Sequence, residues 1–155
     1  MRSVAFCASQ RFKTELSQFT DELRRLAAKR RINLIIFEPN FNGDSYNEKG
    51  LHLLPEKERL LDPTYKAEIA GKVYDHLFRK VKVADVCFVF NKYGYLGANT
   101  NGELFAAAMS GKLIYSLEEK TMMGNFPEDL YEEPSSKKLI HEVVGSPKDL
   151  LLRLL

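Results

Sequence analysis

The chain has 155 residues, of which 45% are hydrophobic, and this size and composition suit one domain with a single core. Its 23 Lys and Arg residues against 21 Asp and Glu residues give a formal charge of +2, which provides no overall field for a nucleic-acid polymer or an anionic membrane. No apolar stretch is long enough to span a membrane, and the N-terminus carries no secretion signal pattern. We therefore expect a cytoplasmic protein.

The first third of the chain predicts a strand, a helix and a second strand. Residues 4–8 are an unalternating apolar run, which is typical of a parallel strand covered on both faces. Ser9 can cap the helix that follows, whose apolar residues recur every three or four positions up to Arg31. Residues 32–37 predict the second strand.

Residues 38–63 are too long for a simple connection in a compact domain. Loops of this kind are functional or disordered, and the apolar residues within this one can form a small helix that packs over the rest of the domain. We therefore favour a lid. The apolar residues are Leu51, Leu53, Leu54, Leu60 and Leu61.

The remaining chain alternates helices and strands. A helix over 64–82 has apolar residues at four-residue steps, and a short Ala-rich helix over 104–109 ends at Gly111. Ser146 and Pro147 mark the start of a last helix as its cap and first residue. The predicted strands are 86–90, 113–117 and 139–144, and residues 121–138 are predicted to be a second long loop.

The predicted fold class is α/β, with residues 1–155 forming a single domain. We expect a doubly wound, flavodoxin-like sheet of five parallel strands in the order 2-1-3-4-5, with helices on both faces. In that order the turn 9–11 faces the turn 91–97 across a crevice. The two long loops, 38–63 and 121–138, follow the second and fourth strands and overhang the same edge.

Cys7 and Cys87 lie inside runs that predict buried strands, so we expect free thiols rather than a disulfide. Neither cysteine has a histidine near it in the sequence. No two histidines or cysteines have the spacing of metal ligands, and we assign no metal and no cofactor.

Gly94, Gly97 and Gly102 follow the third predicted strand and can form a turn whose N–H groups accept a phosphate or ribose hydroxyls. The pattern is neither the dinucleotide fingerprint nor a P-loop. A flexible strand-to-helix turn explains the glycines equally well.

Glu103 has two interpretations. With Thr100 it matches a capping box, in which the carboxylate folds back on the Thr100 N–H. Alternatively, the helix start keeps Glu103 ionised as a nucleophile that attacks the anomeric carbon of a sugar. The local sequence does not choose between these roles.

Other residues near the crevice are candidates for binding. Ser9 and Arg11 can hold a 5′-phosphate at the first helix start, although Arg11 also suits an ordinary exposed position. Tyr93 and Tyr95 can stack on a base or pack on their own loop. His76, on the second helix, is more typical of a surface or packing residue than of a catalyst.

A pattern of residues between positions 75 and 112 resembles the nucleoside deoxyribosyltransferase-like superfamily, and most of all a poorly characterised branch with a Gly-Tyr-Ile-Gly type of turn. The matching positions are residues 75–81, Ala84, Asp85, Asn91, residues 94–97, Thr100, Glu103, Leu104, Ala107, Gly111 and Lys112. They cover about the third quarter of the chain.

The resemblance implies that Glu103 is the nucleophile that holds the sugar while one base leaves and another arrives. It also implies a small-molecule nucleoside or nucleotide as partner, and a homo-oligomer whose neighbouring subunits complete the site. We take the substrate-binding residues to be Ser9, Arg11, Asn91, Tyr93, Gly94, Tyr95, Gly97, Asn99 and Thr100.

The chain departs from the catalytic members of that superfamily in two ways. Their first strand carries a tyrosine that orients the nucleophile, whereas residues 4–8 offer no hydroxyl. Their leaving base is handled by an aspartate, for which Asp75 and Asp85 are the available substitutes. Asp85 also suits a role in closing the loop before its strand.

The leading hypothesis is an enzyme of the N-glycosidic bond, either a hydrolase or a deoxyribosyltransferase. The alternative is a binding module of the same fold that holds a nucleotide or sugar phosphate without turning it over. A third candidate, a nucleoside-monophosphate phosphoribohydrolase, ranks below these because the chain lacks the full Pro-Gly-Gly signature of that family.

Overall fold

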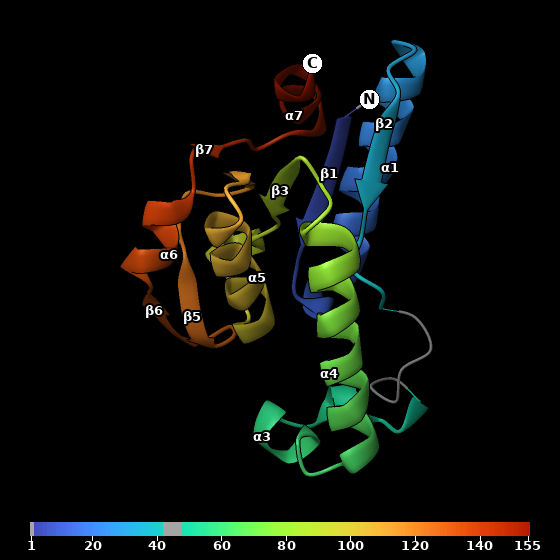
Figure 1. The fold of residues 1–155 in the computed structure, drawn as a ribbon. Coiled ribbons are helices and arrows are strands. Elements are labelled where there is room, and N and C mark those ends of the chain that lie inside the picture. Colours follow the sequence, from blue (N-terminus) through green and yellow to red (C-terminus); the bar gives the residue numbers. More distant parts are fainter. Residues whose placement is uncertain (1, 42–47) are drawn as a thin grey trace.

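The computed structural model describes residues 2–41 and 48–155, and its centre is a five-stranded parallel sheet (Figure 1). The strands lie in the order β2-β1-β3-β4-β7, which confirms the predicted order 2-1-3-4-5. Their bounds are β1 Arg2–Cys7, β2 Leu34–Phe37, β3 Val86–Val89, β4 Leu113–Ser116 and β7 Glu142–Val143.

Residues 4–7 of β1 and the whole of β3 are apolar because helices cover both faces of the sheet. Side chains alternate between the faces, so Val4 and Phe6 pack with α1 (Lys13–Lys29) and α7 (Pro147–Leu154). Ala5 and Cys7 pack on the opposite face with α5 (Ala98–Met109). The alternation therefore sends Cys7 towards the helices that follow β2 and β3.

Polar caps set the starts of the helices. Ser9 accepts a hydrogen bond from the Arg11 N–H, although it caps the 3-10 turn η1 (Gln10–Phe12) that precedes α1. Asp62 accepts from the Tyr65 N–H at the start of α4 (Pro63–His76). Ser146 caps α7 as predicted, with its hydroxyl oxygen accepting from the Asp149 N–H.

The α4 helix continues into a π-helical turn, η3 (Leu77–Val81). A π turn spaces its residues differently from an α-helix and is often found at functional sites. The junction falls directly after His76, which is buried.

The described part of the predicted lid contains two short helical turns, η2 (Leu51–Leu53) and α3 (Glu56–Arg59). Leu51 is buried, whereas Leu53 and Leu61 are exposed. Residues 42–47 of the segment lie outside the described part. Closure of this segment over the site stays a prediction.

The prediction of a loop over residues 121–138 is wrong. This segment forms an antiparallel hairpin, β5 (Met122–Asn125) with β6 (Asp129–Glu132), followed by α6 (Pro134–Leu139). Gly124 has a positive φ of 118°, and a Cβ there would lie 2.4 Å from the Asp129 carbonyl oxygen. The glycine that suggested a loop therefore permits close pairing of the two strands.

The last predicted strand and the predicted Ala-rich helix also differ in extent from the elements of the structure. Residues 139–144 shorten to the two-residue strand β7, because α6 occupies residues up to Leu139. The helix predicted over 104–109 begins six residues earlier, at Ala98, with Gly97 as its N-cap. Among the described residues, none of the helices combines the length and apolar character needed to cross a membrane.

Candidate active site

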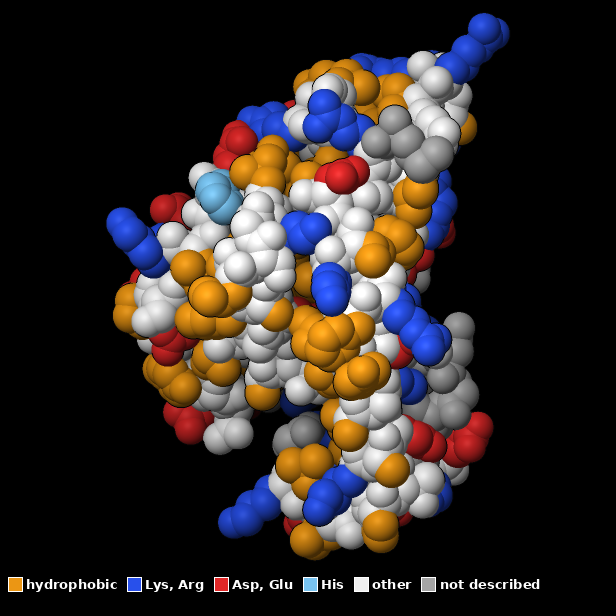
Figure 2. Space-filling model, viewed as in Figure 1, with side chains coloured by type: hydrophobic (Ala, Val, Ile, Leu, Met, Phe, Trp, Pro, Cys, Tyr) orange, Lys and Arg blue, Asp and Glu red, His pale blue; other side chains and the backbone are white. Residues whose placement is uncertain are grey.

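A cavity of about 760 Å³ lies at the carboxyl ends of the strands, where the chain was predicted to form a crevice. Five regions line it: the turn after β1, residues 39–41 after β2, the segment from α3 into α4, the start of α5 with the turn before it, and the β5–β6 hairpin. Figure 2 shows the surface hollowed between the α3 segment and the lower end of α5. The cavity is therefore bounded on two sides by the segments inserted after β2 and β4.

Seven of the ten predicted site residues line this cavity. They come from the turn after β1 and from the start of α5, so the fold brings the two predicted turns together across one space. These residues are Ser9, Arg11, Tyr95, Gly97, Asn99, Thr100 and Glu103.

The other three predicted site residues, Asn91, Tyr93 and Gly94, lie outside the cavity lining. Asn91 is fully buried, and its Oδ1 accepts hydrogen bonds from the N–H groups of Leu117 and Glu118, both at 3.0 Å. Its Nδ2 donates to the carbonyls of Glu118 and Lys120, at 2.9 and 2.7 Å. The amide thus ties β3 to the chain leaving β4.

Tyr93 and Gly94 support the turn itself. Tyr93 has a positive φ of 57°, and its ring packs near Phe12 and Phe126. Gly94 also has a positive φ, and a Cβ there would lie 2.8 Å from the Lys120 Cβ. Only a glycine allows this approach of the turn to the chain after β4.

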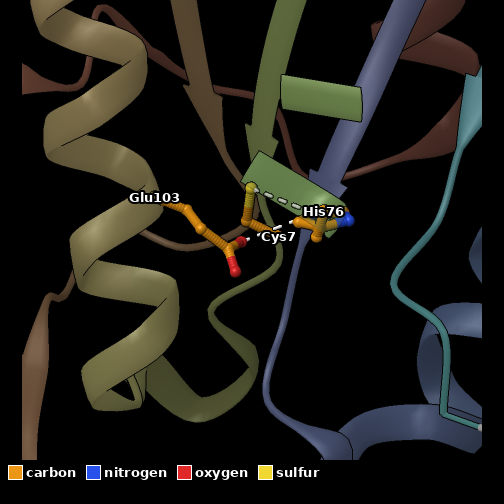
Figure 3. Close-up of side chains that lie close together, drawn as sticks. All are labelled: Cys7, His76 and Glu103. Atoms are coloured by element: carbon orange, nitrogen blue, oxygen red, sulfur yellow. Dashed lines mark hydrogen bonds and ion pairs between the residues drawn. The ribbon is translucent and has the colours of Figure 1, made fainter. Parts of the chain in front are cut away.

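The predicted capping box at Thr100 and Glu103 is wrong, because α5 starts at Ala98. Glu103 therefore lies in the second turn of the helix, where its carboxylate cannot fold back on the first N–H groups. Its side chain points instead towards the end of β1 and the end of α4 (Figure 3). Only 7% of Glu103 is exposed, and it lines the cavity.

Cys7, His76 and Glu103 meet at the floor of the cavity, although they come from three different elements (Figure 3). The His76 Nε2 lies 3.4 Å from the Glu103 Oε2 and 3.7 Å from the Cys7 Sγ. In a nucleophilic triad the histidine uses opposite ring nitrogens for its two partners. Here one nitrogen contacts both partners, so the three residues are not a thiol-histidine-carboxylate relay.

Burial is the main influence on the pKa values of Glu103 and His76. It raises the pKa of Glu103 to about 7, against the lowering effects of the Cys7 contact and the Lys80 ammonium. Burial also lowers the pKa of His76 to about 4, aided by Lys80. The helix start therefore does not keep the pKa of Glu103 at its usual value, because a carboxylate in the second turn gains little from the helix dipole and loses its water.

Both cysteines are free thiols, as predicted, and both are fully buried. The Cys7 Sγ lies 3.6 Å from the Cys87 Sγ on the neighbouring strand. This contact, together with burial, raises the pKa of Cys7 well above its usual value. Cys7 is thus held as a neutral thiol at neutral pH.

The sequence prediction missed the meeting of His76 and Cys7 with Glu103. Sixty-nine positions separate Cys7 from His76, so spacing along the chain carried no signal. Strand alternation was an available signal, because it places Cys7 on the same face as Ala5 at the carboxyl end of β1. The sequence favoured a surface or packing role for His76, and the structure places this side chain in a buried position beside Glu103.

Basic side chains also line the cavity. Arg11, Arg59 and Lys72 lie in the lining, and the Arg11 guanidinium stands 5.8 Å from the centre of the Tyr95 ring and 5.6 Å from that of Phe126. Among the described side chains of the lining, Glu103 is the one that carries a carboxylate. The cavity therefore suits an anionic ligand that presents an uncharged part to its floor.

The two aspartates considered for handling a leaving base lie elsewhere. Asp75 forms an ion pair with Arg79 at 3.3 Å, and neither residue lines the cavity. Asp85 lies before β3, at the opposite end of the strand, where it accepts hydrogen bonds from Ser3. Neither aspartate thus reaches Glu103, whose titratable neighbours in the group are His76 and Cys7.

Two solved structures share this architecture across nearly the whole chain. A conserved protein from Enterococcus faecalis V583 aligns with a TM-score of 0.57 and 16% identity, over 99% of this chain and 97% of its own. A 2-deoxyribosyltransferase from Bacillus psychrosaccharolyticus aligns with a TM-score of 0.52 and 13% identity, over 96% of this chain and 90% of its own. The chain is similar in fold to a 2-deoxyribosyltransferase.

The resemblance to the nucleoside deoxyribosyltransferase-like superfamily is thereby confirmed at the level of the fold. At these identities the deoxyribosyltransferase-like fold alone is established, and the roles of individual residues rest on the geometry of the cavity. No protein-family model matches the chain, and no curated protein matches its sequence.

Proposed function

We propose that this protein acts on the N-glycosidic bond of a nucleoside or nucleotide, with Glu103 as the nucleophile. The observation that carries the proposal is the direction of the Glu103 side chain, which faces the cavity floor beside His76 instead of capping α5. The similarity in fold to a 2-deoxyribosyltransferase supports the same reaction class.

One proton shared between Glu103 and His76 suffices for the reaction. When the proton lies on His76 Nε2, the Glu103 carboxylate is free to attack C1′ of the sugar. An ester bond forms between the carboxylate oxygen and C1′ while the C1′–N bond breaks, and the departing base takes its proton from His76. Water or a second base then breaks the ester and returns the proton to the pair.

The basic residues of the lining favour a nucleotide over a nucleoside. Arg11 lies beside the turn after β1 and above two aromatic rings, where it can bind a phosphate while a base packs against Tyr95. Ser9 and the N–H groups at the start of α5 add further donors to the same wall.

Incubation with a panel of deoxynucleosides, ribonucleosides and their monophosphates, followed by chromatography for free base, tests this proposal. We expect Glu103→Gln to lower base release by at least about 1000-fold, because it removes the nucleophile. Glu142→Gln is the matched control, since Glu142 pairs with Arg153 outside the cavity lining and its loss should leave the rate unchanged. Unchanged base release by the Glu103 variant would exclude Glu103 as the nucleophile.

A non-catalytic binding module is the second candidate. It is favoured by Cys7, which stands beside the carboxylate where the catalytic members of the resembled superfamily use a tyrosine hydroxyl. Calorimetry that detects nucleotide binding, together with no free base after long incubation, would favour this candidate. Addition of a second base to the reaction separates transfer from hydrolysis.

A further inference from the structure

Cys7, His76 and Glu103 bring a sulfur, a nitrogen and a carboxylate oxygen to one point at the cavity floor. No two of the three donor atoms are more than 4.8 Å apart, and all three residues are buried. The proposed glycosidic reaction uses the carboxylate and the imidazole but gives the thiol no task. Cysteine, histidine and glutamate are, however, the side chains that bind Zn²⁺ in proteins.

The two separations that involve His76 are close to those of a tetrahedral site, and the third, from Cys7 to Glu103, is no longer than 4.8 Å. With Zn–S bonds of about 2.3 Å and Zn–N or Zn–O bonds of about 2.0 to 2.1 Å, neighbouring ligand atoms stand about 3.4 to 3.6 Å apart. The measured distances are 3.4 Å from His76 Nε2 to Glu103 Oε2 and 3.7 Å from His76 Nε2 to Cys7 Sγ. A cation between them needs little movement of the backbone.

The charges of the three groups also suit a divalent cation. A Cys7 thiolate and a Glu103 carboxylate carry two negative charges, and a neutral His76 adds none, so bound Zn²⁺ leaves the buried site neutral. A thiolate ligand selects Zn²⁺, Co²⁺ or another thiophilic cation over Mg²⁺ and Ca²⁺, which prefer oxygen.

The site is open on one side. His76 and Glu103 line the cavity, whereas Cys7 is fully buried beneath them at the end of β1. Three protein ligands below an open cavity leave a fourth position for water or a ligand, as in catalytic rather than structural zinc sites. Cys87 lies behind Cys7 on β3 and stands outside the described group of three.

We propose that Cys7, His76 and Glu103 form a binding site for Zn²⁺ or another thiophilic divalent cation, with a fourth coordination position open to the cavity. Binding displaces the thiol proton, together with any proton that Glu103 and His76 share, so protons are released as the ion binds. The bound ion draws negative charge from the Glu103 carboxylate, so the metal-bound protein should form the glycosyl ester more slowly than the metal-free protein.

Titration of the reduced, metal-free protein with Co²⁺ tests this site. We expect one ion per chain, a sulfur-to-cobalt charge-transfer band in the near ultraviolet, and displacement of Co²⁺ by Zn²⁺. Cys7→Ser should abolish the band and weaken binding by at least about 100-fold, since loss of a ligand costs more than loss of an outer partner. Cys87→Ser is the matched control and should keep the band, because Cys87 is equally buried but outside the group.

Absence of the band in the folded wild-type protein would overturn the proposal, as would a band that survives in Cys7→Ser and disappears in Cys87→Ser. Should Cys7→Ser not fold, Glu103→Gln replaces it, and that variant should keep the band while binding Co²⁺ at least about tenfold more weakly. Unchanged Co²⁺ affinity in Glu103→Gln would equally overturn the site. These readouts do not involve base release, so the metal site and the proposed reaction fail independently.

Discussion

Two carboxylates at opposite ends of the parallel strands, Asp85 and Glu103, have different surroundings. At the amino-terminal edge, Asp85 accepts hydrogen bonds from the Ser3 N–H at 2.8 Å and from the Ser3 hydroxyl at 3.0 Å, and its own N–H donates to the Ser3 oxygen at 2.9 Å. At the carboxyl-terminal edge, Glu103 is buried beside a neutral imidazole and a thiol.

The two environments move the pKa values in opposite directions. Hydrogen bonds from Ser3 lower the pKa of Asp85, whereas burial raises that of Glu103 to about 7. Asp85 accepts its hydrogen bonds from Ser3, and this pair links β1 to the chain just before β3. The contacts of Glu103 with Cys7 and His76 do not offset its burial, so this carboxyl keeps its capacity to bind, accept a proton or attack. A perturbed carboxyl that lines a cavity is thus the better candidate for function.

The largest expected difference between the two edges is in catalysis. His76→Asn should lower base release by about 100-fold, because it removes the group that exchanges a proton with Glu103. Asp85→Asn should leave the rate within about threefold of wild type. Chromatographic rates for the two variants on the same nucleotide check this, and equal losses would remove the functional distinction between the edges.

A smaller effect is expected in the pH dependence of stability. The pKa of Glu103 is raised on folding, so its contribution is fully present below the unfolded value of 4.5 and is lost as the pH rises through about 7. Glu103→Gln removes this loss. The free energy of unfolding of the variant relative to wild type should therefore grow by about 2 kcal/mol between about pH 5 and about pH 8.

Urea denaturation of both proteins at several pH values, with a chelator present to keep them metal-free, measures this difference. A difference that stays constant with pH would show that burial does not perturb Glu103. The direction of the trend distinguishes this carboxyl from Asp85, whose effect has the opposite sign.

The smallest effect is expected at Asp85. Its pKa is lowered on folding, so its contribution is present above the unfolded value of 3.8 and is lost as the pH falls through the folded value. Because the group is exposed, Asp85→Asn should lower the Tm only slightly at neutral pH. Thermal unfolding should show the difference vanishing in acid, and Ser3→Ala, which removes the hydroxyl partner, should reproduce the loss.

Most of the strands and their order were predictable, because each strand is formed by a continuous apolar run in the sequence. Strands such as β3 are unbroken apolar runs, and the caps Ser146 and Pro147 fix the start of α7. The β5–β6 hairpin was not predictable, since Gly124 and Pro127 indicate a loop until the close approach of Gly124 to Asp129 is known. Gly97 was likewise predicted to belong to a separate turn, whereas it is the N-cap of α5.

Only part of the candidate site followed from the sequence. Glu103 and the turn after β1 were found because strand order brings them to one edge. The meeting of His76 with Cys7 joins α4 to β1, two elements far apart in the sequence, so no pattern within either element predicts the contact. Asn91 carried the same polar signal as a binding residue, yet its four hydrogen bonds hold backbone groups.

The β5–β6 hairpin is fastened to the turn before α5 by the hydrogen bond from the Leu96 N–H to the Met122 carbonyl. It supplies one wall of the cavity, and the α3 segment supplies another, while the reactive groups stand on β1, α4 and α5. The residues of the proposed chemistry thus lie on other stretches of chain than these two walls. We expect exchange of the hairpin residues to change which molecules enter the cavity while Cys7, His76 and Glu103 stay in place.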